Sequence, residues 1–286
     1  MKTHFIRHKS RTYFQRKCPP SIMALGCFDG VHQAHRKVIQ TAVDLAKERG
    51  LKASVMTFTP HPKEVIHDEK VGMLTTLSQK KSLIRELGVD VLYVVRFDQM
   101  FAALSPKQFV LEYVKRLHVQ HVVAGFDFTY GARGQGNMSQ IVKDGDHTFT
   151  ATTIPIKKVD QQTISSTIIR NKVSAGQLKK IRHYLGRNYK TIGKVVPLRN
   201  TYRIHVDERY VLPKTGMYEI FLHFFQQKWR AIVTCNKEKR DIRLWSWNGT
   251  PYFNLNHLVT IEWLKHMKSS DITDDAQSFF HKVVRV

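Results

Sequence analysis

The sequence predicts an α/β domain with a parallel sheet, followed by a small antiparallel β-barrel domain with a terminal helix. Up to about residue 186, short apolar runs alternate with helical patterns, which is typical of a parallel sheet covered by helices on both faces. Beyond that point, strand patterns follow one another with only turn residues between them. The chain has 286 residues, 42% of them hydrophobic, which suffices for two cores. We therefore expect two domains, at residues 1–186 and 187–286.

The expected strands and helices of the first domain alternate in order along the chain. The helix at 35–49 has the clearest pattern, because its apolar residues fall on one face and Gly50 follows its end. At 105–116, Ser105 and Pro106 suit the N-cap and the first position of a helix. Further helices are expected at 78–87 and 165–184. Strands are expected where apolar residues run together, at 22–26, 53–58, 91–95, 121–124 and 151–156.

The second domain is expected to hold five strands and a helical tail. Turn-forming residues separate the apolar runs, as they do in antiparallel barrels and sandwiches. The strands are expected at 190–196, 202–206, 217–225, 229–234 and 242–247. Residues 271–286 carry a helix-like pattern.

The charge of the chain is strongly positive. Lys and Arg number 46 against 23 Asp and Glu, a net charge of +23. Such a surplus favours anionic partners, which are nucleotides, phosphates or nucleic acids; a cationic surface that only serves solubility is the alternative. The surplus is concentrated at 161–206, where ten Lys or Arg occur without any Asp or Glu.

The three cysteines predict free thiols in a reducing cytoplasm. Cys18, Cys27 and Cys235 are odd in number and widely spaced, and none forms a Cys-x-x-Cys pair. This pattern argues against a disulfide framework and against a structural zinc site. No apolar run reaches the length that a bilayer requires, and the basic N-terminal segment lacks the apolar core of a secretory signal. We therefore expect a cytoplasmic protein with no membrane partner.

The segment from Gly26 to His35, with the sequence GCFDGVHQAH, lies between an expected strand and an expected helix. Its glycines let the backbone turn sharply and approach a ligand closely. The following helix directs its free N–H groups and positive dipole end at the turn, which suits phosphate. His32 and His35, three residues apart, can donate hydrogen bonds to phosphate oxygens. The alternative is a tight turn with two surface histidines.

A second segment, ISSTIIR at 164–170, places three hydroxyl groups and an arginine at an expected helix start. Ser165, Ser166 and Thr167 offer donors beyond a simple N-cap, and Arg170 supplies a fixed positive charge. Such a turn can hold a triphosphate. An ordinary cap on an amphipathic helix is the alternative.

A third segment, rich in glycine, begins at Gly125 after an expected strand and extends to Asn137. Within it, Asp127 can orient a ribose, a base or a metal ion, and Phe128 follows closely. The alternative is a long loop in which Asp127 caps a turn.

A fourth segment, TFTPHP at 57–62, also follows a strand. Phe58 offers a flat face to a ring, and the turn with Pro60, His61 and Pro62 is stiff. The alternative is a phenylalanine that belongs to the core.

In this order, the four segments resemble the prokaryotic FAD synthetase family, in which an FMN adenylyltransferase domain precedes a riboflavin kinase domain. The resemblance runs from about 22 to 194 and includes a further stretch at 96–110. It implies a Rossmann-like nucleotidyltransferase domain that transfers AMP from Mg²⁺-bound ATP to FMN. The implied products are FAD and pyrophosphate, without a covalent enzyme intermediate.

The resemblance also implies roles for individual residues. Those implied to act on the ATP phosphates are His32, His35, Ser165, Thr167 and Arg170. Those implied to bind ATP around them are Gly26, Phe28, Asp29, Gly30, Asp127 and Ser166. Those implied to lie near the flavin are Phe58, Pro60, His61, Pro62, Phe128 and Asn137. No residue is implied as a metal ligand of the protein, because Mg²⁺ enters with ATP, and nucleic acid is not an expected partner.

The sequence departs from the family pattern in both domains. Ala34 stands where the signature has glycine, and its Cβ can crowd a phosphate; Cys27 replaces a common asparagine. In the second domain, residues 197–203 replace the Gly-Phe-Pro-Thr-Ala-Asn segment of the kinase. The family also needs a catalytic glutamate on a later strand, yet 239–261 contains no Glu and only Asp241. We therefore predict that riboflavin kinase activity is absent.

Two other interpretations remain open at this point. The acceptor can be a different phosphorylated metabolite, although the 57–62 segment favours a flavin. Alternatively, the chain is a catalytically weak or inactive sensor of flavin or nucleotide whose basic surface binds RNA. In that case the affinity for nucleic acid falls steeply with salt.

Overall fold

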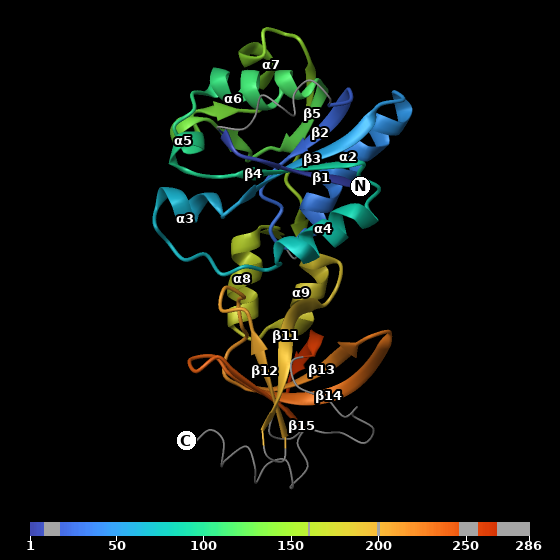
Figure 1. The fold of residues 1–286 in the computed structure, drawn as a ribbon, viewed down its shortest axis with the longest axis vertical. Helices are drawn as coiled ribbons and strands as arrows, with labels where there is room; N and C mark the ends of the chain where they lie inside the picture. The colour runs from blue at the N-terminus through green and yellow to red at the C-terminus, as the bar shows by residue number, and fades with distance from the viewer. Residues whose placement is uncertain (9–17, 160, 199–200, 246–256, 268–286) are drawn as a thin grey trace. The chain divides into compact units, whose positions relative to one another are not determined.

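We describe the protein from a computed structural model, which describes residues 1–8, 18–159, 161–198, 201–245 and 257–267 (Figure 1). Its contacts divide the chain into two compact units. The first unit comprises Met1–Val71 and Leu77–Ile164, and the second comprises Gly72–Thr76 and Ser165–Val286. The expected functional division at 186/187 stays a prediction.

The first unit is built on a six-stranded sheet in the order β1-β4-β3-β2-β5-β8, in which every neighbouring pair is parallel (Figure 1). Its strands are β1 (Lys2–Ile6), β2 (Ser21–Leu25), β3 (Lys52–Thr59), β4 (Val91–Arg96), β5 (Val119–Gly125) and β8 (Thr150–Ile154). The chain adds β3 and β4 on one side of β2, and then β5 and β8 on the other. Ligands of such sheets bind at the carboxyl ends of the strands where this reversal occurs, which here are β2 and β5.

Both faces of the sheet are covered. Ile22 and Ala24 of β2 belong to one core cluster, together with residues of α2 (Gln33–Glu48) and α4 (Leu77–Glu86). Met23 and Leu25 belong to a second cluster, together with residues of α6 (Pro106–Tyr113) and α7 (Ile141–Asp144). Since successive residues of a strand point to opposite faces, the all-apolar β2 sequence IMAL is what a doubly covered strand requires.

Short elements complete the first unit. Ser105 caps α6 as predicted: the Gln108 N–H donates to Ser105 Oγ (3.2 Å), and the Ser105 N–H donates to Gln108 Oε1 (2.8 Å). The other helices are α3 (Pro62–Ile66), α5 (Gln99–Ala102) and the 3₁₀ turns Lys115–Leu117 and Ala132–Gly134. The short strands are β6 (Thr129–Tyr130), β7 (Gly136–Asn137), β9 (Lys158–Val159) and β10 (Gln162–Thr163).

The second unit contains a closed antiparallel barrel in the order β11-β12-β15-β14-β13-β16. Its strands are β11 (Tyr189–Leu198), β12 (Thr201–Val206), β13 (Gly216–Phe224), β14 (Gln227–Asn236), β15 (Asp241–Trp245) and β16 (Leu258–His266). Two helices precede the barrel, α8 (Ser166–Ser174) and α9 (Leu178–Leu185). The buried face of α9 is apolar, whereas its exposed face carries Lys179, Lys180, Arg182 and His183.

The predicted fold class is confirmed: a parallel α/β sheet and an antiparallel barrel are both present. The strands and helices expected in the first domain are all found, and the 165–184 pattern resolves into α8 and α9. Two strands were not predicted, β1 at the edge of the sheet and β16, which closes the barrel. The predicted helical tail at 271–286 lies outside the described residues.

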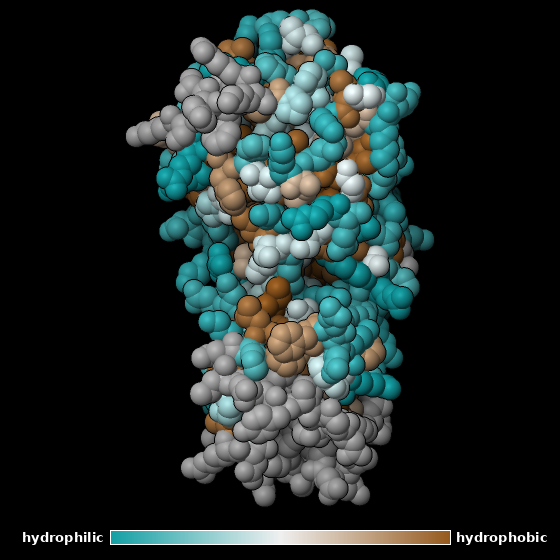
Figure 2. All heavy atoms as spheres, turned by 45° about the vertical axis from the view of Figure 1, so that its right-hand side comes forward, coloured by the Kyte–Doolittle hydropathy of each residue, from teal (hydrophilic) through white to brown (hydrophobic). Residues whose placement is uncertain are grey.

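The surface is predominantly hydrophilic on the face drawn in Figure 2, where apolar side chains are scattered among polar ones. Within the described residues, no helix combines the length and the apolar character that a membrane span requires.

Glu262 on β16 is the charge centre of one side of the barrel. Its Oε1 accepts from Asn188 Nδ2 (2.7 Å), and its Oε2 lies 2.6 Å from His223 Nε2 and 3.3 Å from Lys190 Nζ. Burial raises the pKa of Glu262, but these donors outweigh it and hold the pKa at about 2, below the usual 4.5. A depressed pKa contributes stability that is present above about pH 4.5 and is lost as the pH falls towards 2.

Glu262→Gln is therefore expected to lower the free energy of unfolding by about 2 kcal/mol at pH 7, because it leaves Lys190 and His223 without their counter-charge. Urea unfolding at pH 7, 4.5 and 3 measures this, and the difference between variant and wild type should shrink towards pH 3. The exposed Glu208→Gln is the control, with an expected change within about 0.5 kcal/mol. A difference that stays constant with pH contradicts the charge account.

Candidate active site

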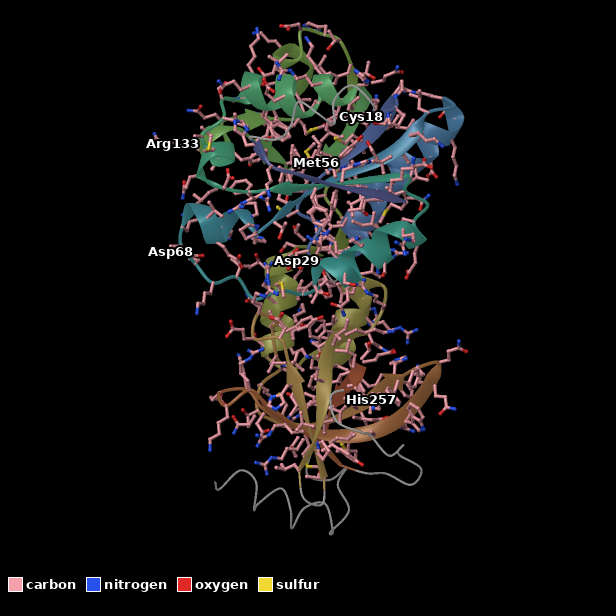
Figure 3. The ribbon with its side chains drawn as sticks, viewed as in Figure 1. Cys18, Asp29, Met56, Asp68, Arg133 and His257 are labelled. Atoms are coloured by element: carbon pink, nitrogen blue, oxygen red, sulfur yellow. The ribbon has the colours of Figure 1, made fainter. Side chains whose placement is uncertain are left out.

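Three of the four predicted segments meet at one edge of the sheet in the first unit. The Gly26 turn follows β2, the Gly125 loop follows β5, and Thr59–Pro60 follows β3, and these three strands are neighbours. Leu25 at the end of β2 is aligned with Met56 of β3 and Ala124 of β5. Figure 3 shows Met56 within the sheet and Asp29 beyond its end. The segments therefore surround the position where a parallel sheet binds its ligand.

The turn after β2 has an unusual backbone. Phe28 has φ 51°, Gly30 has φ 78°, and Val31 has φ 38°. Positive φ is ordinary for glycine, but it is strained for a bulky residue and more so for a β-branched one. The Phe28 and Val31 side chains are 1% and 0% exposed, so core packing holds the strained residues in place. Such strain persists where the surroundings determine the conformation, and it is concentrated at functional sites.

Gly26 gives the Phe28 ring its room. A Cβ placed on Gly26 would lie 2.9 Å from both Cε1 and Cζ of Phe28, closer than carbon atoms approach in proteins. Asp29, next in the turn, is 5% exposed. The glycine predicted from the sequence is therefore required by close packing within the turn itself.

His32 is the N-cap of α2. Its Nδ1 accepts a hydrogen bond from the His35 N–H (3.2 Å), and its carbonyl accepts from the Arg36 N–H (2.8 Å). Because Nδ1 is an acceptor, the ring N–H of His32 is on Nε2. The His32 and His35 rings are stacked, with 3.4 Å between centroids and 16° between planes, and the Phe28 ring meets His35 edge-on at 5.2 Å. The cap thus orders both imidazoles as one unit.

The start of α2 is electrostatically suited to an anion. Its first turn holds no acidic residue, so nothing offsets the positive end of the helix dipole. Gln33, the first residue of the helix, accepts a hydrogen bond from Lys157 Nζ through Oε1 (2.8 Å). Backbone N–H groups, two ordered imidazoles and a lysine therefore lie together, as in sites for phosphate groups.

The loop after β5 is partly rigid and partly exposed. Asp127 is exposed, and Phe128 is half-buried with its ring stacked on Tyr130 (6.1 Å). The Tyr130 hydroxyl donates to Asp144 Oδ2 (2.6 Å), and burial together with this contact raises the pKa of Tyr130. The side-chain oxygen of Asn137 accepts from the Ser139 N–H (3.0 Å) and hydroxyl (2.6 Å). Asp127 is therefore the exposed acid of this loop, and Asn137 shapes its return.

The segment after β3 has a different character from the one expected. The Phe58 ring is 8% exposed and packs against Phe97 (6.0 Å) and Phe101 (5.6 Å), so here it is a core residue. His61 caps α3, because its Nδ1 accepts from the Lys63 N–H (3.2 Å). Pro60, His61 and Pro62 are the members of this segment that lie beyond the strand.

The segment 165–170 belongs to the second unit, so its participation in this site is part of the proposal below. Ser165 is the N-cap of α8, as predicted, and its Oγ accepts from the Ile168 N–H (3.3 Å). Ser166 and Thr167 form the first turn of the helix. Arg170 Nε donates to the Gly72 carbonyl (2.7 Å), within the same unit.

Sequence reasoning missed two residues behind the turn, Lys80 and Thr57. Lys80 lies on α4 and is 8% exposed, although lysine is rarely buried. Its Nζ donates to the Cys27 carbonyl (2.8 Å) and to Thr57 Oγ1 (3.3 Å). A signal was present, because Leu77, Lys80 and Ile84 share one face of the helix at spacings of three and four. Among the described residues, no group of three His, Cys, Asp or Glu side chains is placed to hold a metal ion.

Comparisons with known proteins agree with this arrangement. A family model described as FAD synthetase matches residues 14–168. A bifunctional riboflavin kinase/FMN adenylyltransferase of Bacillus subtilis is 36% identical over 94% of this chain and 90% of its own length. The protein of that name from Listeria monocytogenes is 40% identical over 77% and 73%, respectively. A second Listeria monocytogenes protein, an FAD synthetase, is 29% identical over 70% and 80%.

The fold as a whole has a counterpart among solved structures. The crystal structure of a macrolide-efflux protein from Streptococcus pneumoniae has a TM-score of 0.82 and covers 100% of this chain and 97% of its own, at 24% identity. At that identity, the likeness shows a shared fold.

Proposed function

We propose, because this chain belongs to the FAD synthetase family, that it transfers AMP from Mg²⁺-bound ATP to FMN and releases FAD and pyrophosphate. The observation that carries the proposal is the stacked pair of His32 and His35 at the α2 N-terminus, on the switch point of the sheet. This arrangement offers donors where negative charge develops during nucleotidyl transfer.

In the proposed reaction, an oxygen of the FMN phosphate attacks the α-phosphorus of ATP. The bond from that phosphorus to the bridging oxygen breaks, and pyrophosphate leaves with its electron pair. His32 Nε2–H and the His35 ring stabilise the charge on the phosphates, and the Gly26–Gly30 turn lets backbone N–H groups approach them. Mg²⁺ arrives as part of the Mg²⁺-bound ATP substrate.

The remaining roles follow the resemblance residue by residue. Ser165, Ser166, Thr167 and Arg170 form the second nucleotide-binding segment, and Asp127 orients the nucleoside. Pro60, His61, Pro62, Phe128 and Asn137 line the flavin, whereas Phe58 supports them from the core. Because the loop after β5 is exposed at Asp127, it is available to a ligand.

We propose further that the barrel has no riboflavin kinase activity. Asp241 is the acid on β15 where the kinase requires a glutamate, and both of its carboxylate oxygens are engaged. Arg203 Nε lies 2.7 Å from Oδ1, and Arg243 Nε lies 2.8 Å from Oδ2. A carboxylate held by two guanidinium groups is a poor acceptor for a substrate proton.

Acceptor specificity tests the proposed reaction. ATP labelled at its α-phosphate is supplied with FMN, or with phosphorylated acceptors that lack a flavin ring, such as ribose 5-phosphate. We expect label in FAD only with FMN, and one pyrophosphate for each FAD. Label transferred to a non-flavin acceptor and not to FMN would identify a different nucleotidyltransferase.

The second candidate is an RNA-binding sensor, and the exposed face of α9, with three Lys or Arg and one His, is the observation that favours it. Binding to a mixed RNA at 50 and 200 mM salt tests it. A contact with several phosphates should lose at least tenfold in affinity over that range. Tight RNA binding without FAD synthesis would favour the sensor.

Ala34→Gly is expected to raise kcat/KM for ATP by about threefold to tenfold, because it removes the Cβ from the second residue of α2, beside the phosphate site. It should also lower the free energy of unfolding by up to about 1 kcal/mol, since glycine is a weak helix former. Steady-state kinetics and urea unfolding measure the two effects. An unchanged kcat/KM would show that Ala34 does not crowd the nucleotide.

A further inference from the structure

Lys80, Thr57 and the Cys27 carbonyl form a closed triangle of hydrogen bonds behind the turn that follows β2. Lys80 Nζ donates to the Cys27 oxygen (2.8 Å) and to Thr57 Oγ1 (3.3 Å), and Thr57 Oγ1 donates to the same Cys27 oxygen (2.8 Å). Thr57 is fully buried, and Lys80 is 8% exposed. All three residues belong to the first unit.

The triangle saturates one backbone carbonyl. A carbonyl oxygen has two lone pairs, and the Cys27 oxygen uses both, one of them for a charged donor. Hydrogen bonds to charged groups are stronger than those between neutral groups. Taking a lysine out of water is unfavourable, so a buried ammonium directed at one carbonyl points to a specific role.

The carbonyl that is held lies at the start of the strained turn. Phe28, Gly30 and Val31, the next residues with positive φ, lead directly to His32 at the N-cap of α2. Core packing fixes the Phe28 and Val31 side chains, but it does not fix the orientation of the peptide that enters the turn. The Lys80 and Thr57 donors do so, because they determine where the Cys27 carbonyl points.

We propose that Lys80 and Thr57 are positioning residues that hold the Cys27–Val31 turn in the shape that binds the ATP phosphates. The inference rests on the proposed adenylyltransferase function. Lys80 acts through the turn and also places a positive charge behind a site for a polyanion. Its loss should therefore affect ATP and leave FMN binding nearly unchanged.

Four variants separate this role from a general contribution to the core. Lys80→Met keeps the length of the side chain without its charge or donor. Thr57→Val removes the hydroxyl, and Thr57→Ser restores it. Lys81→Met, one residue further along α4, is the matched control, because Lys81 contacts only the Phe5 ring among its printed neighbours, at 6.0 Å. Each is assayed for kcat, for KM of ATP and of FMN, and for the dissociation constant of ATP by calorimetry, below its melting temperature.

We expect Lys80→Met to lower kcat/KM for ATP by at least tenfold while KM for FMN changes less than twofold. Thr57→Val should lower kcat/KM for ATP by about threefold to tenfold, and Thr57→Ser and Lys81→Met should stay within twofold of wild type. The inference is overturned if Lys80→Met behaves like Lys81→Met, if both substrates are affected equally, or if Thr57→Ser fails as Thr57→Val does.

The same measurements distinguish a failure of this inference from a failure of the proposed function. If the wild-type protein makes no FAD, the adenylyltransferase proposal falls, and the positioning role is then judged by ATP binding alone. Weaker ATP binding by Lys80→Met, by tenfold or more, would support the role in that case. Equal binding by wild type and variant would overturn it.

Discussion

His32→Asn is expected to lower kcat for FAD synthesis by about 100-fold or more while leaving the fold intact. Asparagine is a good N-cap residue, so its side-chain oxygen can replace Nδ1 as the acceptor of the His35 N–H. What the variant loses is the Nε2–H donor and the ring that stacks on His35 at 3.4 Å. Steady-state kinetics with FMN and ATP measure the loss, and thermal unfolding verifies that the fold is retained.

His32→Ala separates the capping role from the chemical one. It should lose as much activity as His32→Asn and, in addition, about 1 kcal/mol of the free energy of unfolding, because the α2 cap is gone. If His32→Asn retains more than a tenth of the wild-type kcat, His32 serves the helix rather than the phosphates. That result would remove the observation on which the proposed function depends.

Gly26→Ala is expected to lower kcat/KM for ATP by about tenfold or more and the free energy of unfolding by about 1–3 kcal/mol. The new Cβ would lie 2.9 Å from the Phe28 ring, which is 1% exposed and has nowhere to move. The turn must therefore shift, and the shift reaches Asp29 and His32. Kinetics and urea unfolding measure the two effects.

Gly50→Ala is the matched control for Gly26→Ala. Gly50 follows α2 with φ 63°, and a Cβ placed there meets nothing within 4 Å. Its substitution should decrease stability by about 1 kcal/mol through the backbone alone and leave kcat/KM unchanged. Equal effects on activity at both positions would mean that the loss at Gly26 is a general consequence of instability.

Much of the fold follows from local patterns that the sequence displays openly. Strands such as β2 and β4 are apolar on both faces, so they are recognised without knowledge of their neighbours. β1, with the sequence KTHFI, and β16, with LVTIEWLKH, are not, because polar and charged residues interrupt them. Their pairing depends on β4, β11 and β13, which are distant in the chain.

The candidate site was predictable to the extent that its residues form contiguous segments. The turn at 26–35 can be recognised because glycines and histidines lie between a strand and a helix. Lys80 was not predicted, because its partner Cys27 is 53 positions away and a lysine on a polar helix is normally exposed. Phe58 shows the reverse: the sequence offers an aromatic face, but three-dimensional packing places the ring in the core. The site residues as a set remain a prediction until they are tested.

The most direct test of the central claim supplies the pure protein with ATP and Mg²⁺ and with either FMN or riboflavin, and then separates the flavins by chromatography. The account predicts FAD from FMN and no change in riboflavin, because the nucleotide site is formed in the first unit and Asp241 of the barrel is held by two arginines. FMN appearing from riboflavin would contradict the proposal for the barrel. No FAD from FMN would contradict the proposed function itself.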